Sequence, residues 1–400
     1  MRNRFLASLH SRWEHRDWDQ AAEHWGRKAK RAERRRGAGD PGSLDAREQH
    51  AAAELSLGHQ AEAAAEFDAV AQLRAAALGA DHKDTLRARV WHAQALHQSG
   101  RYAEAEPAWQ MIITERGRLL GAQHPDTLAV RLGRVATLRE LGRLAEALAE
   151  VRDLTDTWES VAGHFRSSLQ ARRWQATILR DLGEPAQAAE VQLSLLATAS
   201  AQLGEGHSDT LLYRSEYART LCGQNRYAEA EAEYRALIPR LRAVTGQLSR
   251  ETLGARAAHA DTLRELGRPH DAEAELTLVT ATLRARLGSG DPVTLNARHS
   301  HARALLKLGH PADAADELRQ VVTGFSAAVG PAHLATLWAK AWLGVALHDT
   351  GHPEEAATVL GQAIAELTRL VGADHPNLRQ PREHLAALYA DGQGREEPRA

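Results

Sequence analysis

The chain has 400 residues, of which 43% are hydrophobic and 26% are charged, the balance of an ordinary folded soluble protein. Its formal net charge of −2 gives no general attraction to nucleic acid or to an anionic membrane. A single cysteine, Cys222, excludes an intrachain disulfide and a thiolate metal cluster. The N-terminus turns polar too early for a signal peptide, and no stretch reaches the roughly 20 apolar residues of a membrane span. A cytoplasmic protein without membrane contact is therefore predicted.

Residues 1–42 predict a degenerate N-terminal repeat or cap. A first helix is expected to contain Phe5 and Trp13, and a second covers residues 15–36 with Ala21 on its apolar side. The second helix ends in the densest charge run of the chain, which an anionic partner such as nucleic acid would fit. A solvated helix end, where cations favour the negative end of the helix dipole, is the preferred interpretation. Nucleic acid is therefore not an expected partner.

Residues 43–377 repeat with a period of 42 residues, shortened twice to 41. One column of the repeat is a leucine, usually preceded by threonine, and a second column is a glycine. The leucines stand at positions 44, 86, 128, 169, 211, 253, 295, 337 and 378, and the glycines at 37, 79, 121, 163, 204, 246, 288, 330 and 372. Two columns that keep register over nearly the whole chain predict eight helical hairpins, stacked as one uninterrupted array.

Each period predicts two helices separated by a turn. The first carries small and then apolar residues seven and ten positions after the leucine, as in Ala93 and Leu96. The turn holds glycine or, once, Asn225, both of which tolerate the left-handed backbone that closes a helix. The second helix opens near an alanine followed by large apolar residues, as in Ala105 and Trp109. Neither helix buries its apolar stripe alone, so the repeats must stack, and strand signals are absent. The predicted fold is all-α.

The stretch Gly121-Ala-Gln-His-Pro-Asp-Thr-Leu128, followed by Leu141-Gly-Arg-Leu-Ala-Glu-Ala147, closely resembles the 42-residue tetratricopeptide repeats (TPR) of the kinesin light chain type. The resemblance covers roughly residues 15–390. It implies a right-handed α-solenoid of about nine helix-turn-helix repeats, whose first helices line a concave inner groove. It says little about the ligand, because the family shares an architecture rather than a partner. Heavy use of alanine and arginine indicates a bacterial source.

The C-terminal end predicts a cap. Residues 378–390 form a lone helix of the first type, with Ala386 and Tyr389 in register. Residues 391–400 are polar and rich in glycine, and a disordered tail is expected there.

The resemblance places the inward positions four, eight and eleven residues after the repeat leucine. Charged residues on this row are Arg139, Arg173, Arg180, Arg219, Asp261, Arg264 and Arg303, joined by His299. Six arginines against one acid would attract an acidic peptide or a free carboxylate. The adjacent column carries Glu140, Asp181, Glu265 and Asp349, which would neutralise the arginines within each helix. Both interpretations stay open.

Kinesin-light-chain-like repeats often carry an asparagine four or five residues after the leucine, which holds a peptide backbone. This sequence has none there, which argues against backbone clamping of an extended peptide. Trp174, Trp338 and Trp342 are candidate aromatic anchors for a helical partner. Packing between repeats is the preferred role for these three.

A basic column stands three residues after the leucine. It reads Arg47, Arg89, Arg131, Arg172, Arg214, Arg256, Arg298, Lys340 and Arg382. Its place on the packed side requires partners, since an unpaired buried charge is costly. We expect the acids that open each second helix, such as Glu62 and Glu104, to supply them.

No metal, cofactor or catalytic site is predicted. Six of the 21 histidines lie in the loops between repeats, at positions 82, 124, 164, 207, 333 and 375, without a second ligand in close spacing. Helix entry and loop packing are their expected roles. No phosphate-binding glycine loop and no nucleophile elbow is present.

The sequence thus predicts a non-enzymatic scaffold or adaptor that binds a protein or peptide segment, acidic in character, in the concave groove. The alternative is a ligand-sensing regulator whose solenoid tightens around a signalling peptide or a small molecule.

Overall fold

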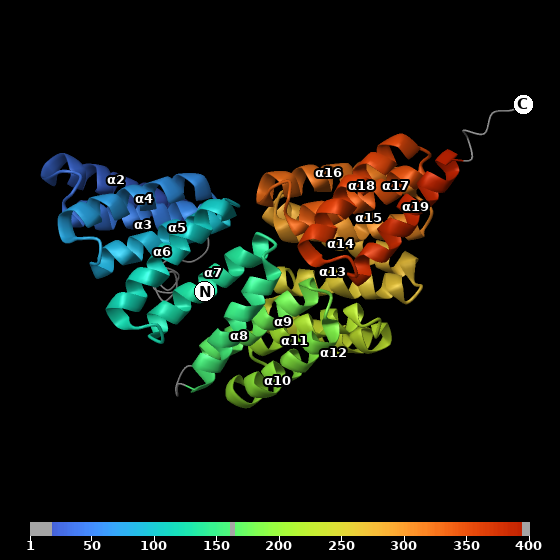
Figure 1. Ribbon diagram of the computed structural model, residues 1–400, viewed down its shortest axis with the longest axis horizontal. Coiled ribbons are helices and arrows are strands. Elements are labelled where there is room, and N and C mark those ends of the chain that lie inside the picture. Colours follow the sequence, from blue (N-terminus) through green and yellow to red (C-terminus); the bar gives the residue numbers. More distant parts are fainter. Residues whose placement is uncertain (1–17, 161–164, 394–400) are drawn as a thin grey trace, which may run out of the picture. The chain divides into compact units, whose positions relative to one another are not determined.

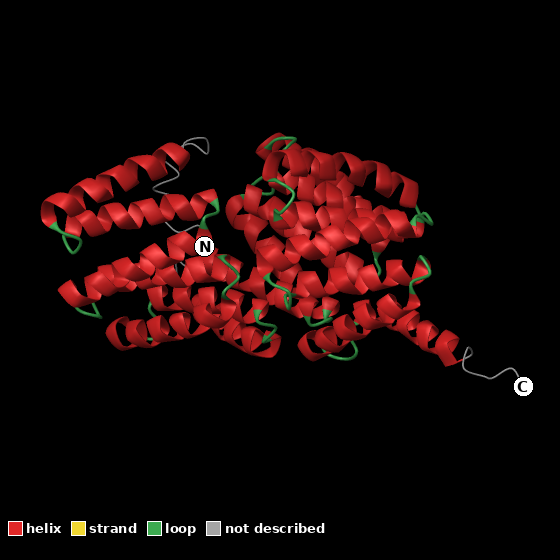
Figure 2. Cartoon of the chain, turned by 90° about the horizontal axis from the view of Figure 1, so that it is seen from above, coloured by secondary structure: helices red, strands yellow, loops and turns green. Residues whose placement is uncertain are grey.

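The computed structural model describes residues 18–160 and 165–393, and within these ranges every regular element is a helix (Figure 2). The first helices of the hairpins are α3 (Pro41–Leu57), α5 (Lys83–Gln98), α7 (Pro125–Glu140), α9 (Phe165–Asp181), α11 (Ser208–Gly223), α13 (Arg250–Glu265), α15 (Pro292–Lys307) and α17 (Leu334–Asp349). The second helices are α4 (Gln60–Leu78), α6 (Tyr102–Leu120), α8 (Leu144–Ser160), α10 (Pro185–Leu203), α12 (Tyr227–Thr245), α14 (Pro269–Leu287), α16 (Pro311–Val329) and α18 (Pro353–Val371). The prediction of an all-α helical-repeat fold is confirmed.

Single helices flank these pairs. α2 (Trp18–Arg36) precedes them, and the helix expected around Phe5 and Trp13 lies outside the described residues. At the other end, the short 3-10 helix η1 (Pro376–Leu378) leads into α19 (Arg379–Gln393). The colours of Figure 1 follow this order from blue to red.

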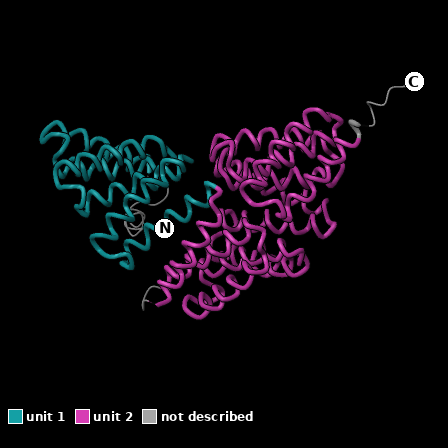
Figure 3. Tube along the Cα trace, in the orientation of Figure 1, with its two compact units in different colours: residues 1–141 teal, residues 142–400 magenta. Residues whose placement is uncertain are grey.

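The chain divides into two compact units, residues 1–141 and 142–400 (Figure 3). The boundary falls in the turn between α7 and α8, so it cuts through one predicted hairpin. The repeats stack within unit 1 and within unit 2, and the eight hairpins in one array stay a prediction. Leu141-Gly142-Arg143 has the same form as the other turns, such as Leu266-Gly267-Arg268, and nothing in the sequence marks this boundary.

The loop histidines explain how the first helices begin. In α5, α7 and α11 the residue before the helix is a histidine whose Nδ1 accepts a hydrogen bond from the backbone N–H two residues on, at 3.1–3.2 Å. His333 and His375 do the same for α17 and η1. An acceptor at this place satisfies one of the unpaired N–H groups at a helix start. The predicted helix-entry role is confirmed for these five, and His164 lies outside the described residues.

Replacing His207 by Ala is expected to lower the free energy of unfolding of unit 2 by about 1 kcal/mol, because the Asp209 N–H loses its acceptor. His207→Asn, which can cap in the same way, should restore most of the loss. Urea unfolding followed by circular dichroism measures both, and equal losses for the two variants would contradict the capping role.

The threonine that usually precedes the repeat leucine forms a hydrogen bond in the same loop. The threonine hydroxyl donates to the carbonyl oxygen of the repeat glycine six residues earlier, as Thr85 does to Gly79 at 2.9 Å and Thr336 to Gly330 at 2.7 Å. Gly79 has φ +97°, a conformation that side chains with a Cβ rarely adopt. The glycine and threonine columns therefore keep register because they build one loop together.

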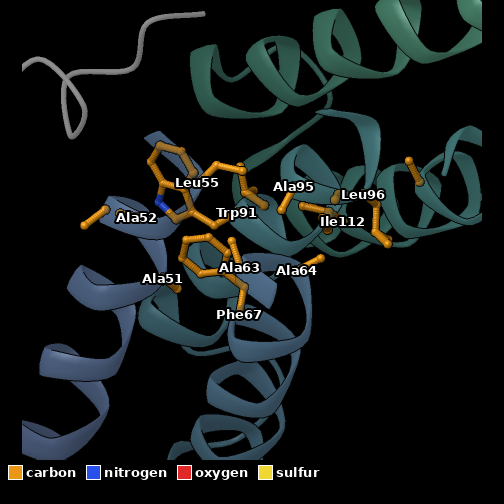
Figure 4. Packing of buried hydrophobic residues seen from close by; sticks show 14 of the residues in the cluster. Ala51, Ala52, Leu55, Ala63, Ala64, Phe67, Trp91, Ala95, Leu96 and Ile112 are labelled. Carbon is orange, nitrogen blue, oxygen red and sulfur yellow. The ribbon is translucent and has the colours of Figure 1, made fainter. Parts of the chain in front are cut away.

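The small alanine of each second helix lets the helices pack closely, and large residues fill the space beside it. In unit 1, Ala63 is fully buried, and the rings of Phe67 and Trp91 stack with centroids 5.8 Å apart (Figure 4). In unit 2, Tyr234 and Leu237 are fully buried at the equivalent positions of α12. The core of unit 1 runs from α2 to α7, and that around Tyr234 joins α11 and α12 to α13, which is the stacking that the repeat predicts.

The basic column three residues after the leucine is structural, but its predicted partners are wrong. Arg47, Arg256 and Arg298 bind a glutamate nineteen residues later, near the middle of the second helix, at 2.5–3.1 Å. Four of the acids that open the second helices, Glu104, Glu146, Glu229 and Asp271, bind the arginine three residues earlier instead, at 2.6–2.7 Å. The correction follows from helix length, because the side chain of the first helix lies beside the middle of its antiparallel partner and cannot reach its start.

The end of the chain differs slightly from the prediction. The helix predicted over residues 378–390 begins one residue later and continues through Gln393. No residue in 391–393 is a proline, so the backbone can stay helical past the last apolar position. Residues 394–400 lie outside the described part. No described helix has both the length and the apolar character that a membrane span needs.

Candidate functional site

The first helices form the layer on which partners are expected. In unit 2, α11 contacts both α9 and α13, and α15 contacts both α13 and α17 (Figure 1). Direct contact between successive first helices brings equivalent positions of neighbouring repeats together. The position four residues after the leucine is accordingly buried in most repeats, as at Ser215, Ala257 and Ala341. It packs against the adjacent first helix, so the row open to a partner is narrower than predicted.

A polar cluster lies on this layer, formed by Asp261, Arg264 and Glu265 of α13, His299, Ser300 and Arg303 of α15, and Trp342 of α17. Nη2 of Arg264 lies 3.0 Å from Oδ1 of Asp261 and 2.8 Å from Oε1 of Glu265. The Ser300 hydroxyl donates to Oδ2 of Asp261 at 2.6 Å. The cluster therefore links two successive repeats through one carboxylate.

Arg303 joins the cluster to the third helix. Its guanidinium lies 3.3 Å from Glu265, and its Cζ lies 4.5 Å from the centroid of the Trp342 ring. Stacking of a guanidinium on an indole is attractive and holds the arginine in place. The side chain of Arg303 keeps 21% of its surface exposed, so a partner can still reach it.

Burial and neighbouring charges together shift the pKa values of Asp261, His299 and Arg303. Burial alone would raise the pKa of Asp261, but Arg264 and Arg303 outweigh it and hold that pKa at about 2. Burial and the nearby Arg303 lower the pKa of His299 to about 3. Burial and Arg264 lower the pKa of Arg303 to about 10. At neutral pH the cluster thus holds a charged Asp261, a charged Arg303 and a neutral imidazole.

Two nitrogens of the cluster are buried without a hydrogen-bond partner among the described residues. These are Nε of Arg303 and Nε2 of His299. A neutral imidazole offers an N–H at one of its nitrogens, and arginine Nε always carries one. Buried polar atoms are rarely left unpaired, and each one needs an explanation. Nε of Arg303 needs an acceptor, whereas Nε2 of His299 needs an acceptor or a donor according to its tautomer.

The structure brings only some of the predicted groove residues together. Arg264, His299, Arg303 and Trp342 meet in the polar cluster. The others lie apart. Arg139, in unit 1, binds Glu140 at 2.7 Å, and Arg173 binds Glu216 at 2.8 Å. Arg180 and Trp174 are half-buried on α9, Arg219 is exposed on α11, and the ring centroids of Trp338 and His375 are 5.4 Å apart.

At several positions the arginines of the inward row are neutralised by acids of the adjacent column. Glu140 and Glu265 of the adjacent column do bind Arg139 and Arg264. Within the polar cluster two arginines face two carboxylates. Arg219 forms no ion pair within the described part of the chain, and it keeps its positive charge exposed.

The sequence did not single out Glu216 and Ser300, whereas for Trp342 packing between repeats was the preferred role. All three stand five residues after the repeat leucine, and each reaches back to the preceding first helix: Glu216 to Arg173, Ser300 to Asp261, and Trp342 to Arg303. In this column the prediction considered the missing asparagine and two of the tryptophans, Trp174 and Trp342. Its polar and aromatic members were a signal that could have located the cluster.

Comparison with known families supports the repeat assignment. Two profiles described as tetratricopeptide repeat match the chain, one over residues 93–126 and 336–377 and the other over residues 169–191 and 295–320. The chain carries tetratricopeptide repeats. The predicted repeat type is thereby confirmed, and proteins built from these repeats generally mediate contacts between proteins.

Solved structures show which repeat proteins the chain is similar to. A putative kinesin light chain of Podosopora anserina with nearly identical TPR-like repeats is 22% identical, with 50% of this chain and 95% of that chain covered and a TM-score of 0.38. A tetratricopeptide repeat protein from Parabacteroides merdae is 16% identical, with 76% and 98% covered and a TM-score of 0.48. A Rap protein complexed with competence and sporulation factor is 10% identical, with 77% and 99% covered and a TM-score of 0.46. No curated protein matches the chain significantly.

Proposed function

We propose that the chain is a non-enzymatic interaction protein, and that unit 2 binds a short acidic segment of a partner protein across α13, α15 and α17. The observation that supports this most directly is Arg303, whose side chain keeps 21% of its surface exposed while its Nε has no hydrogen-bond partner among the described residues. The guanidinium of Arg303 stacks on the Trp342 ring, which supplies an apolar surface for the rest of the segment.

The proposal depends on hydrogen bonding more than on net charge. Because Asp261 and Glu265 balance Arg264 and Arg303, the cluster attracts anions weakly at long range. A carboxylate that enters it meets fixed donors that are already desolvated, which gives charge-assisted hydrogen bonds of about 1.5–3 kcal/mol each. The exposed Arg219 on α11 adds an attractive charge at the side of the site.

A displayed library of random peptides tests the proposal with the full chain. We expect selected peptides to share at least one Asp or Glu, and Arg303→Met to weaken their binding about ten- to a hundredfold. Methionine keeps an apolar stem over Trp342 and removes only the donors. Fluorescence anisotropy with a labelled peptide gives the dissociation constants.

The matched control is Arg319→Met, on the exposed side of α16 in the same repeat. It should leave binding unchanged. Selection of peptides without acidic residues, or equal binding by Arg303→Met and the wild type, would contradict the proposed site. Under the alternative of a ligand-sensing regulator, binding would also shrink the radius of gyration in solution scattering, which a scaffold with an open row does not require.

A further inference from the structure

Two histidines that the proposed function does not use face each other at the C-terminal end of unit 2. His348 lies near the end of α17 and His384 lies on α19. Their Nδ1 atoms are 3.0 Å apart, and their rings are nearly perpendicular, at 86°. The carboxylate of Asp349 stands beside them, with Oδ1 4.0 Å from Nδ1 of His348 and 3.8 Å from Nδ1 of His384.

This arrangement has two chemical explanations. The imidazoles can share one hydrogen bond, which requires that Nδ1 of one ring carries a proton and that of the other does not. Alternatively, both Nδ1 atoms are lone-pair donors to one cation. Imidazole nitrogens bind zinc at about 2.0–2.1 Å, so two of them around a tetrahedral ion lie about 3.3 Å apart. The observed separation is within a few tenths of an ångström of that value.

The third donor fits the same ion. The three ligand atoms, one from each residue, all lie within 4.8 Å of one another. Asp349 is exposed, so a change of side-chain rotamer can close the remaining gap without moving the backbone. Two histidines and one carboxylate form a ligand set that zinc takes in proteins, with a fourth position left for water or another group.

We propose that His348, Asp349 and His384 bind one zinc ion that fastens the cap helix α19 to α17. The ligands come from two helices, and His384 follows Asp349 by 35 residues of chain, so the bound ion acts as a cross-link at the end of the repeat stack. The site does not depend on the proposed peptide row. It also revises the prediction of no metal site, which was argued from the loop histidines and did not consider this pair.

Zinc titration of the purified full chain, against a chromophoric chelator, tests the site directly. We expect one ion per chain to be bound with clear preference over any other histidines, and bound Co²⁺ to show the intense visible bands of a four-coordinate complex. His348→Ala and His384→Ala should abolish both signals. Zinc should raise the melting temperature of the wild type and leave that of these variants unchanged.

Two further variants keep the test decisive even where an alanine weakens the packing of α19. Asp349→Asn alters an exposed side chain, so the variant should fold normally. It should bind zinc at least about tenfold more weakly, because loss of a residue that only hydrogen-bonds a ligand already has an effect of this size and Asp349 would be a ligand itself. His310→Ala removes an exposed histidine that makes no capping hydrogen bond and should bind zinc like the wild type. Failure of the wild type to compete with the chelator, or unchanged zinc affinity in His384→Ala, would reduce the pair to a simple hydrogen bond.

Discussion

Replacing Glu48 by Gln is expected to lower the free energy of unfolding of unit 1 by about 3–5 kcal/mol, the largest effect that a single polar change should have there. The Glu48 side chain is 1% exposed and lies between two arginines. One of its oxygens contacts Nη1 of Arg74, whose side chain is 3% exposed, and the other accepts from Nε of Arg87 at 2.8 Å. Glutamine keeps the shape and removes the charge, which leaves the buried guanidinium of Arg74 without its closest anion.

The comparison with Asp45 separates burial from charge. Asp45 binds the same Arg74 at 2.7 Å, but its side chain is 68% exposed. Asp45→Asn should therefore cost no more than about 1 kcal/mol. Urea unfolding of both variants, followed by circular dichroism, measures the difference, and similar losses would contradict the assignment of Glu48 as the main partner.

A double replacement shows whether the pair stabilises the fold or only avoids an unpaired charge. Glu48→Leu together with Arg74→Met removes the two most buried members and leaves apolar groups of similar volume. We expect this variant to be clearly more stable than Glu48→Gln, because the desolvation of both charges is avoided. Arg87 stays half-exposed and can be hydrated or bind Asp84, which lies 3.0 Å away.

Most of the fold could be predicted from the repeat columns of the sequence, for a physical reason. Glycine, threonine and the loop histidine each satisfy a local backbone requirement, so they recur wherever the loop recurs. Partner choice along the packed side depends instead on where an antiparallel helix ends. For that reason Arg256 was correctly placed on the packed face, while its partner, Glu275, was not foreseen.

The candidate sites were harder to predict because they depend on contacts between repeats. Arg303 belongs to one repeat, its carboxylate Glu265 to the previous one and its aromatic partner Trp342 to the next. The pair of His348 and His384 likewise joins a repeat to the cap, where the two residues occupy different columns. Column counting within single repeats gives the charges on a row, but it does not show which charges are already neutralised by a neighbour.

Asp261→Asn should lower the free energy of unfolding of unit 2 by about 2–3 kcal/mol at neutral pH. Burial opposes the charge of Asp261, but Arg264 and Arg303 outweigh it and hold the pKa of this carboxyl at about 2, well below its ordinary value of 3.8. Asparagine loses the attraction to both guanidinium groups, and the Arg264 side chain, only 4% exposed, keeps Glu265 as its remaining partner. The expected loss is smaller than for Glu48 because Glu265 is only 30% exposed, whereas the second carboxylate of Arg74, Asp45, is 68% exposed and interacts more weakly.

The pH dependence of this loss has a definite sign. A carboxyl whose pKa is lower in the folded state stabilises the fold fully above its unfolded pKa, and the stabilisation disappears as the pH falls through the folded value. The difference between wild type and Asp261→Asn should therefore be constant above about pH 4 and shrink towards pH 2. His299, whose pKa burial lowers to about 3, titrates in both proteins, and because Asp261 raises the pKa of that imidazole, part of the change near pH 3 belongs to His299. Urea unfolding at a series of pH values measures the curve. A difference that stayed constant down to pH 2 would mean that Asp261 stabilises unit 2 through its shape and its hydrogen bond to Ser300, and its negative charge would then play no part in holding the arginines of the proposed binding row.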